Sequence, residues 1–359
     1  MTIIRVQAGP SAYDVIVGPV EAGIDRIADL ARGQVPLLVS EPRLFALHGD
    51  RIATALGCAN PILVAEGEAA KDWVGLQQLI GEFAARNIAR STPIVALGGG
   101  SVGDLTGLAA ALVKRGCPVV HIPTTLLAQA DSAIGGKTAI DAHGEKNLVG
   151  TFHQPALVIV DPTLLDTLDQ RQMRSGYAEI VKYGLIDDPA FFAWCEANGR
   201  GVIAGHRDLR EQAIVTAIRA KARIVAADVD DRTGQRALLN LGHSFAHAIE
   251  SEAGIGKLLH GEAVALGIAL CFLNCAGLGL CPAADADRVV THLAAAGLPT
   301  RLADVGLAGR GAALLGWMAR DKKNLDTGLA LVLVRGISKA FLDPAVDSRR
   351  LAAFLDRAT

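Results

Sequence analysis

The chain has 359 residues, and its 35 lysines and arginines against 37 aspartates and glutamates give a formal net charge of −2 at pH 7. This balance argues against a nucleic-acid-binding protein and against a polybasic membrane-surface protein, because both need a surplus of basic residues. With 51% hydrophobic and 20% charged residues, the chain can bury a large core. Its length exceeds the roughly 250–300 residues at which single cores stop growing, so we expect two domains.

The first part of the chain alternates short apolar runs with amphipathic segments. Ile3–Val6 and Asp14–Val17 flank Gly9-Pro10 and predict a β-hairpin. A helix is expected at Asp72–Arg86, and further strands are expected at Pro36–Ser40, Pro61–Ala65, Pro93–Leu97, Pro118–Ile122 and Leu157–Val160. Continuous apolar strands separated by helices are typical of a sheet that is buried on both faces. We therefore expect residues 1–169 to form an α/β domain.

The pattern becomes helical after Asp169. Residues 170–359 are expected to form a second, mainly helical domain with strands only at Leu331–Val334 and Ala340–Leu342. Its helices are predicted at Arg171–Tyr183, Asp208–Ala227, Ala237–Ala253, Glu262–Ala276, Ala284–Ala296 and Gly311–Arg320.

Several features bear on where the protein works. The uncharged stretch Ala263–Ala284 is long enough to span a membrane, but Asn274, Pro282 and three internal glycines favour a buried core helix. The first residues contain polar breaks and no long apolar run of the signal-peptide type. The six cysteines are too scattered for a disulfide framework or a four-thiolate zinc site. We expect a cytoplasmic protein with no membrane or nucleic-acid partner.

A glycine-rich segment, residues 98–104 (GGGSVGD), follows the strand expected at Pro93–Leu97 and opens a helix. This is a GxGxxG arrangement in the context in which glycines let the backbone approach a pyrophosphate at a helix N-terminus. The acidic ribose-binding residue that usually follows about 20 positions later is missing, and Glu41 instead ends an earlier strand. Nucleotide binding by a Rossmann-like domain in a non-standard order is the prediction. A glycine-rich turn without a ligand remains the alternative at this point.

A second glycine-rich loop, Gly135-Gly136-Lys137-Thr138, resembles the end of a phosphate-binding P-loop. A P-loop needs a glycine six positions before the lysine, and Asp131 stands there, so a P-loop NTPase is rejected. Single lysines are usually solvated surface groups. Two lysines and an asparagine around glycines, Lys137 with Lys146 and Asn147, favour a cradle for an anion instead.

Three of the nine histidines fall within eighteen positions in the second half. His243 and His247 are one helical turn apart, and His260-Gly261-Glu262 follows. With a carboxylate from elsewhere they would suit Zn²⁺, whereas packed or capping histidines are the alternative for each one alone. Gly242–Ala246 also matches a degraded nucleophile elbow around Ser244, but that motif needs a preceding strand and the flanks predict helix.

Taken together, these segments resemble one family. The segments are GGGSVGDLTG (98–107), PTTLLAQADSAIGGKTAI (123–140), GEKNLVG (144–150), SGYAEIVKYG (175–184), RALLNLGHSFAHAIE (236–250), HGEAVALG (260–267) and RDKK (320–323). In order and at compatible spacing over nearly the whole chain, they strongly resemble the 3-dehydroquinate synthases, which are sugar-phosphate cyclases related in fold to glycerol dehydrogenases. The resemblance implies an α/β Rossmann-like NAD-binding domain followed by a mostly helical metal- and substrate-binding domain.

The resemblance also implies roles for individual residues. The metal, Zn²⁺ or Co²⁺, would be bound by Glu179, His243 and His260, and His247 would face the substrate phosphate rather than pair with His243. NAD would contact Glu41, Glu68, Lys71, Gly99, Gly100, Asp104, Thr124, Thr125, Lys137 and Lys146. The substrate would contact Asp131, Lys137, Lys146, Asn147, Lys182, Lys221, Arg236, Asn240, His247 and Lys323, with Arg115 reaching across a homodimer interface. Catalysis would fall to Asp131, Lys137, Lys182, Lys221, Arg236, Asn240 and His247. Glu41 departs from the aspartate that the family commonly has there, but its carboxylate can still take both ribose hydroxyls.

The implied activity is that of a carbon–oxygen lyase of the shikimate pathway. The substrate, 3-deoxy-D-arabino-heptulosonate 7-phosphate, would be oxidised transiently at C5, lose phosphate, be reduced again and close to 3-dehydroquinate by an intramolecular aldol step. Its carboxylate and phosphate demand a cationic pocket, which the lysines and Arg236 supply. Arg236 lies seven positions before His243, so we expect the two to share one face of a single helix.

Four alternatives stay open at this point. An aminodehydroquinate synthase keeps most of the same residues. Other sugar-phosphate cyclases act on substrates without the carboxylate, and they generally change the positions that correspond to Lys221, Arg236, Asn240 and His247. A glycerol-type dehydrogenase would not need the phosphate cradle. A non-catalytic NAD-binding homologue would be expected to have lost a metal ligand or a pocket lysine.

Overall fold

A computed structural model describes the chain except for residues 10, 230, 232–233, 255, 322–328 and 359. The described chain forms two compact units. The first consists of Met1–Asp169 with Glu211–Asp230, and the second of Gln170–Arg210 with Asp231–Thr359. The division into functional domains after Asp169 stays a prediction, and each unit is described separately below.

The first unit is built on a seven-stranded sheet in the order β1-β2-β9-β6-β5-β3-β4. Only the β1–β2 hairpin is antiparallel, and the other neighbours pair in parallel. The strands are β1 (Thr2–Ala8), β2 (Ser11–Val17), β3 (Leu37–Ser40), β4 (Ile62–Leu63), β5 (Ile94–Gly98), β6 (Val119–Pro123) and β9 (Leu157–Val160). All seven overlap strands predicted from the apolar runs, and the α/β fold of this part is confirmed.

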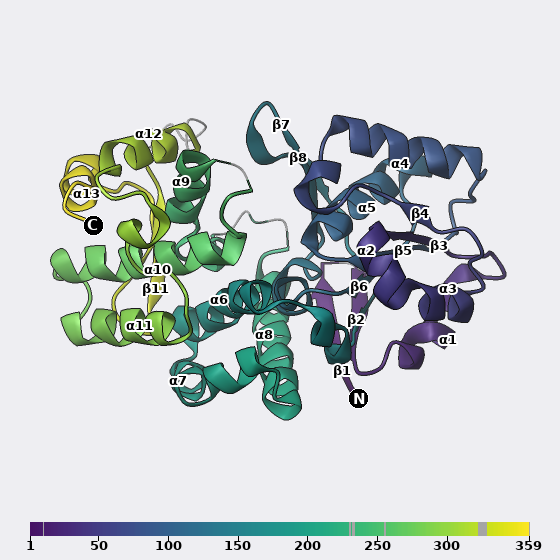
Figure 1. The fold of residues 1–359 in the computed structure, drawn as a ribbon, viewed down its shortest axis with the longest axis horizontal. Helices are drawn as coiled ribbons and strands as arrows, with labels where there is room; N and C mark the ends of the chain where they lie inside the picture. Colours follow the sequence, from purple (N-terminus) through teal and green to yellow (C-terminus); the bar gives the residue numbers. More distant parts are fainter. Residues whose placement is uncertain (10, 230, 232–233, 255, 322–328, 359) are drawn as a thin grey trace. The chain divides into compact units, whose positions relative to one another are not determined.

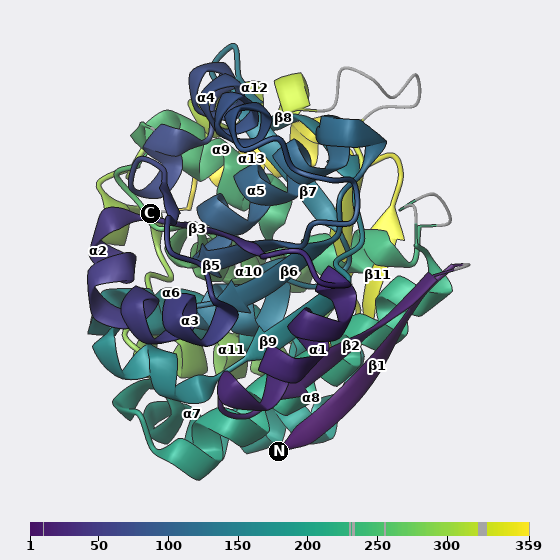
Figure 2. The ribbon, with the colours of Figure 1, turned by 90° about the vertical axis from the view of Figure 1, so that its right-hand side faces the viewer.

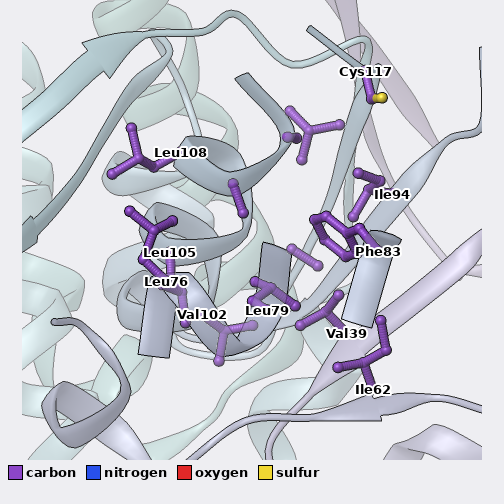
Figure 3. Packing of buried hydrophobic residues seen from close by; sticks show 14 of the residues in the cluster. Val39, Ile62, Leu76, Leu79, Phe83, Ile94, Val102, Leu105, Leu108 and Cys117 are labelled. Carbon is purple, nitrogen blue, oxygen red and sulfur yellow. The ribbon is translucent and has the colours of Figure 1, made fainter. Parts of the chain in front are cut away.

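Helices cover both faces of this sheet, as Figure 2 shows for α4 and α5 on one side of β3 and β5 and for α1 and α3 on the other. Successive residues of β5 belong to two different cores: Ile94 is in the core that contains Phe83 of α4, whereas Val95 is in the core that contains Ile27 of α1. Figure 3 shows the first of these cores, around Leu79, Phe83 and Leu105. The longer helices of the unit are α1 (Glu21–Ala31), α3 (Asp50–Leu56), α4 (Trp73–Ala85) and α5 (Gly100–Leu112).

The carboxyl ends of three neighbouring parallel strands, β3, β5 and β6, bring chemistry-bearing residues to one edge of the sheet. Glu41 follows β3, Gly99 and Gly100 follow β5, and Thr124 follows β6. Open α/β sheets bind their ligands at this edge. The switch from strand to helix after β5 needs Gly98, because a Cβ there would lie 2.5 Å from Cβ of Val102.

The glycine-rich loop expected after Gly135 is a β-hairpin instead. Strands β7 (Lys137–Ala142) and β8 (Glu145–Phe152) pair antiparallel, with an irregularity between Ile140 and Ala142, and His143-Gly144 form the turn at positive φ. A two-residue turn that needs positive φ at both positions is a usual hairpin connection. The hairpin places Lys137 at the start of one strand and Asn147 within the other.

Short helical segments connect these elements. They are α2 (Pro42–Leu44), the π-helical turn η1 (Phe45–Gly49), the 3₁₀ turns η2 (Gly67–Ala70), η3 (Val113–Arg115) and η5 (Pro162–Thr167), and the π-helical turn η4 (Ala128–Ser132).

The second unit is mainly helical, which confirms the expected fold class. Its elements are α6 (Gln170–Asp187), α7 (Pro189–Ala204), η6 (Arg236–Asn240), α9 (His243–Ala253), α10 (His260–Gly277), α11 (Ala283–Ala295), η7 (Leu302–Val305), α12 (Gly311–Asp321) and α13 (Ser348–Leu355), with the antiparallel pair β10 (Leu331–Val334) and β11 (Ala340–Asp343). Helix α8 (Arg207–Ala227) begins in this unit and continues into the first.

Helix α10 is the core helix of the second unit and contacts α6, α9, α11 and β10. Among the described residues, it is the one helix whose length and composition would allow it to cross a membrane. However, 72% of its 18 residues are buried inside the fold. The stretch 263–284 therefore lies mostly in a core helix, as expected. All six cysteines are buried free thiols.

Two helical predictions were wrong. No helix was predicted between Tyr183 and Asp208, yet α7 forms there with Asp188 as its N-cap: the carboxylate of Asp188 accepts a hydrogen bond of 2.9 Å from the backbone N–H of Phe191. The predicted helix Ala237–Ala253 is interrupted, because Gly242 adopts a φ of +79° between η6 and α9. Arg236 and His243 therefore do not share a face of one helix.

Candidate functional site

Three side chains of the second unit converge with donor atoms within 4.8 Å of one another: Glu179, His243 and His260. Glu179 lies in the middle of α6, and the histidines are the first residues of α9 and α10. Nε2 of each histidine lies 3.4 Å from Oε1 of Glu179. Two imidazoles and one carboxylate are a donor set that Zn²⁺ accepts in proteins.

The hydrogen bonds made by Nδ1 of each histidine determine which ring nitrogen can act as a ligand. Nδ1 of His243 donates to the carbonyl oxygen of Leu241 at 3.2 Å. Nδ1 of His260 donates to Oε2 of Glu250 at 3.4 Å. Because Nδ1 of each ring is used in these hydrogen bonds, Nε2, which faces Glu179, is the nitrogen that could bind a cation in the neutral form of the ring. The three residues fit a divalent cation.

Charge at the cluster is balanced by a buried lysine. Nζ of Lys182 lies 2.6 Å from Oε2 of Glu179, and both side chains are buried. Burial alone would raise the pKa of Glu179, but Lys182 and the imidazoles outweigh it and hold that pKa well below its usual value. Burial lowers the pKa of His243. Burial opposes a charge on His260 as well, but hydrogen bonds to Glu179 and Glu250 raise its pKa to about 10.

A close contact between α10 and α6 positions His260 beside Glu179. The backbone N–H of Gly261 donates to Oγ of Ser175 at 3.0 Å, and a Cβ at Gly261 would lie 1.9 Å from the carbonyl oxygen of Ser175. Only glycine allows this approach. Glu262 ties down the same end of α10, because it accepts from the N–H of Leu259 at 2.9 Å and from Arg171 at 2.6 and 2.7 Å.

A second close contact positions His243. Gly242 precedes it in the left-handed region, and a Cβ at Gly242 would lie 2.7 Å from the backbone nitrogen of Ile268. A Cβ at Gly267 would lie 2.1 Å from the carbonyl oxygen of Gly242. The start of α9 therefore rests on α10 backbone to backbone. The segment before Gly242 is the 3₁₀ turn η6, so the strand required for a nucleophile elbow around Ser244 is replaced by a helical turn.

Of the other residues predicted in the second unit, His247 lies beside this cluster. The ring centre of His247 lies 6.0 Å from that of His243 and 6.3 Å from that of His260. Arg236 has a fully buried side chain, 1% exposed, in η6, which contacts α6. Asn240 ends η6 and is exposed. Lys323 lies outside the described residues.

In the first unit, the glycine-rich turn after β5 leaves space where side chains would otherwise lie. A Cβ at Gly99 would lie 3.1 Å from Cγ2 of Thr125, and one at Gly100 would lie 3.2 Å from Oγ of Ser132. The backbone N–H of Thr124 donates to the carbonyl oxygen of Gly98 at 2.9 Å and ties β6 to the turn. A cavity of about 10 Å³, the size that holds one water molecule, lies beside this turn. The geometry suits an anion at the N-terminus of α5.

A network of charges around the buried Lys71 follows the same turn. Nζ of Lys71 lies 2.7 Å from Oδ2 of Asp104 and donates to Oδ1 of Asn147 at 2.5 Å. Oε1 of Glu68 accepts from Oγ of Ser101 at 2.6 Å. Burial is the largest influence on the pKa of Asp104, which it raises. Burial is also the largest single influence on Lys71, where it lowers the pKa, but the nearby carboxylates together outweigh it and raise the pKa. These residues join η2, α5 and the β7–β8 hairpin.

Glu41 lies at the strand end where a ribose-binding carboxylate was expected. Its Oε1 accepts from the N–H of Gly67 at 2.9 Å, and burial raises its pKa. In the same unit, Lys221 of α8 forms an ion pair with Asp131 and also donates to the carbonyl oxygen of Asp131 at 2.9 Å. Lys137 is exposed, Lys146 is half-buried in β8, and exposed Arg115 has a φ of +60°.

Sequence reasoning missed the residues that support the histidines. Ser175 and Glu250 lie in segments that carry the family resemblance, and Arg171 begins a predicted helix. Their partners are 86, 10 and 91 positions away, respectively. Ser175 and Arg171 carry no local signal. Glu250 does, since it follows His243 and His247 at seven and three positions and therefore lies on the same face of a helix.

Comparison with known proteins identifies the family. Residues 61–175 match the family model "3-dehydroquinate synthase N-terminal", and residues 176–324 match "3-dehydroquinate synthase C-terminal". A 3-dehydroquinate synthase from Rhodospirillum rubrum is 46% identical over 363 residues, which cover 99% of this chain and 94% of the relative. One from Zymomonas mobilis is 50% identical over 298 residues, which cover 83% of this chain and 79% of the relative. The chain belongs to the 3-dehydroquinate synthase family.

A solved structure agrees with the family assignment. 2-epi-5-epi-valiolone synthase from Streptomyces hygroscopicus, solved with NAD⁺ and Zn²⁺ bound, has a TM-score of 0.85 and 30% identity, with 98% of each chain covered. The expected fold class, with a parallel α/β unit and a helical unit, is therefore confirmed. So is the enzyme class, because 3-dehydroquinate synthases are carbon–oxygen lyases of the shikimate pathway.

Proposed function

We propose that this member of the 3-dehydroquinate synthase family converts 3-deoxy-D-arabino-heptulosonate 7-phosphate to 3-dehydroquinate and phosphate, with NAD⁺ and one Zn²⁺ or Co²⁺ bound. The observation that carries the proposal is the convergence of Glu179, His243 and His260, with Nε2 of both rings and Oε1 of the carboxylate facing one point. The chain retains this donor set together with family similarity over most of its length.

The residues of each unit suit a different part of this chemistry. Glu179, His243 and His260 would hold the cation, and Lys182 would limit the net negative charge beside it. The backbone at Gly99 and Gly100 would receive the pyrophosphate of the nucleotide, because the N-terminus of α5 favours an anion. When bound, NAD⁺ supplies reversible oxidation at C5 of the substrate, and the cation polarises the oxygen on that carbon.

Charged side chains would orient the two anionic ends of the substrate. The guanidinium of Arg236 can take a carboxylate through two parallel hydrogen bonds, which a lysine cannot do. His247, Asn240 and Lys323 are assigned to the substrate as well, and His247 to its phosphate. In the first unit, Asp131 is oriented by its ion pair with Lys221, while Lys137, Lys146 and Asn147 would contribute to binding the substrate from the β7–β8 hairpin.

Three other reactions remain as outcomes of the test. A cyclase that makes a valiolone or inosose skeleton acts on a substrate without the carboxylate that Arg236 is proposed to bind. An aminodehydroquinate synthase would prefer an amino analogue of the substrate. A glycerol-type dehydrogenase would release NADH in proportion to product, whereas the proposed reaction regenerates NAD⁺ in each turnover.

We also propose that the protein works as a homodimer in the cytoplasm, on a small sugar phosphate and without a membrane or nucleic-acid partner. Arg115, exposed after α5, would be the residue that reaches the partner's substrate site. Sedimentation velocity of the wild-type protein tests the dimer. Arg115→Ala should raise KM for the substrate without changing the affinity for NAD⁺.

The decisive experiment supplies the purified enzyme with heptulosonate phosphate, Zn²⁺ and NAD⁺ in an amount far below that of the substrate. Equal yields of phosphate and 3-dehydroquinate, well above the amount of NAD⁺, are expected. His260→Ala should abolish turnover and metal binding together while the protein stays folded. Accumulation of NADH, or turnover only with a substrate lacking the carboxylate or carrying an amino group, would contradict the proposal.

A further inference from the structure

We propose that Glu250 is a positioning residue: it fixes the ring of His260 and gives Nδ1 of this histidine an anionic hydrogen-bond partner, whereas Nδ1 of His243 has a backbone carbonyl as its partner. The proposal rests on the function proposed above, because it requires that His260 binds the cation. It adds a fourth residue to the cluster, one that would act on the metal only through an imidazole.

The geometry of α9 directs Glu250 toward His260. His243, His247 and Glu250 follow one another at steps of four and three residues, so all three side chains lie on one face of α9. Oε2 of Glu250 lies 3.4 Å from Nδ1 of His260, the first residue of α10. The side chain of Glu250 is 5% exposed. A carboxylate is almost never buried to this extent unless it is paired.

The two histidines of the cluster therefore have unequal partners. His243 donates to a neutral backbone carbonyl, that of Leu241, and His260 donates to a carboxylate. A carboxylate partner makes the imidazole a stronger donor to a metal and fixes its tautomer, whereas a carbonyl fixes the tautomer with less electronic effect. The carboxylate also supplies charge. Lys182 offsets part of the charge of Glu179 at 2.6 Å, and Glu250 adds a second carboxylate beside His260.

If Glu250 were only a structural link between α9 and α10, its variants would bind metal differently from what the proposal predicts. If the contact only holds two helices together, Glu250→Gln keeps a side-chain oxygen that can accept from Nδ1 of His260 and should leave metal binding unchanged. If the charge on the carboxylate matters, Glu250→Gln should weaken metal binding even though the protein keeps its fold. Glu250→Ala removes both the charge and the acceptor.

A matched control lies two residues further along the same helix. The carboxylate of Glu252 pairs with Arg310 and accepts from Nε1 of Trp317 at 2.9 Å, and it makes no contact with the histidines that the structure shows. Glu252→Gln therefore removes a negative charge from α9 without touching the cluster.

The test uses the full-length protein, stripped of metal and titrated with Zn²⁺ against a chelator, and with Co²⁺ while its visible absorption is recorded. We expect Glu250→Gln to weaken binding about tenfold and Glu250→Ala up to about 100-fold, with an altered Co²⁺ spectrum in both. Glu252→Gln should match the wild type in affinity and spectrum. NAD⁺ affinity and the melting temperature of the metal-free protein should change little in Glu250→Gln.

The outcomes separate this proposal from the one on which it rests. Wild-type affinity and spectrum in Glu250→Gln would overturn the positioning role, provided that His260→Ala loses the metal. Equal losses in Glu250→Gln and Glu252→Gln would also overturn it, because they would show a general effect of charge on α9. If His260→Ala keeps the metal, the cation site itself is wrong, and both proposals fail.

Discussion

Replacing Gly261 by alanine tests whether backbone contact between α10 and α6 determines the geometry of the cluster. The new Cβ would lie 1.9 Å from the carbonyl oxygen of Ser175 and 2.5 Å from its carbonyl carbon. Both are backbone atoms in the interior of α6, so no side chain can rotate away. Since real Cβ contacts are essentially never shorter than 3.0 Å, the N-terminus of α10 must move by about 1 Å.

This movement acts directly on two of the proposed ligands. His260 precedes Gly261, and Glu179 lies one helical turn after Ser175, so the shift separates Nε2 of His260 from Oε1 of Glu179, now 3.4 Å apart. Metal–ligand distances in zinc sites hold within about 0.2 Å of 2.0–2.2 Å, so a 1 Å error leaves one ligand out of reach. We expect at least a tenfold loss of Zn²⁺ affinity. Overpacking and the lost hydrogen bond to Ser175 should lower the free energy of unfolding by about 2–4 kcal/mol.

The measurements are chelator competition for Zn²⁺ and urea unfolding of the metal-free protein. Gly277→Ala is the matched control, because Gly277 ends the same helix and a Cβ there meets nothing within 4 Å. It should leave metal affinity unchanged and stabilise the protein by up to about 1 kcal/mol. If Gly261→Ala bound Zn²⁺ like the wild type and unfolded at the same urea concentration, the contact would not determine the site.

Three further predictions concern other parts of the molecule. Arg236→Lys should reduce kcat/KM for heptulosonate phosphate by an amount equivalent to about 2–3 kcal/mol, with NAD⁺ and metal affinity nearly unchanged; wild-type efficiency would mean that the carboxylate is bound elsewhere. Lys71→Met should destabilise the protein by up to about 3 kcal/mol in urea unfolding, because Asp104 loses its cation, and adding Asp104→Asn should recover part of that loss. Burial lowers the pKa of His121 to about 4, below its unfolded value near 6.5, so the folded state binds fewer protons and stability should fall as the pH drops through this range. Compared with His121→Gln, the wild type should lose about 2 kcal/mol more between pH 7 and 5, and parallel pH profiles would refute this.

The parts of the fold that sequence reasoning predicted are those whose signals are local. The strands β3, β5 and β6 are short apolar runs bounded by proline, glycine or charged residues, and the turn after β5 carries the glycines that its geometry needs. The β7–β8 hairpin was missed because its glycines and lysines suggested a loop. Its two-residue turn, His143-Gly144, was the available signal.

The interruption at Gly242 shows where periodicity alone fails. The apolar pattern of 237–253 continues across Gly242, and a single glycine is tolerated in a helix at a cost of about 1 kcal/mol. What decides its conformation is the partner: Gly267 of α10 approaches so closely that only a glycine in the left-handed region fits there. That partner lies in a different helix, and no local pattern reveals it.

The same distinction separates the proposed ligands of the cluster from their supports. The spacing of the histidines predicted a site but paired His243 with His247, and the set of Glu179, His243 and His260 was implied by the resemblance to the family. The supports are common residues in unremarkable positions, and they act through contacts that span 86 and 91 residues for Gly261 with Ser175 and for Glu262 with Arg171. Only the tertiary structure brings these pairs together. Glu250 is the exception, because it lies on the histidine face of its own helix, and a carboxylate at that spacing is a signal that a sequence search can use.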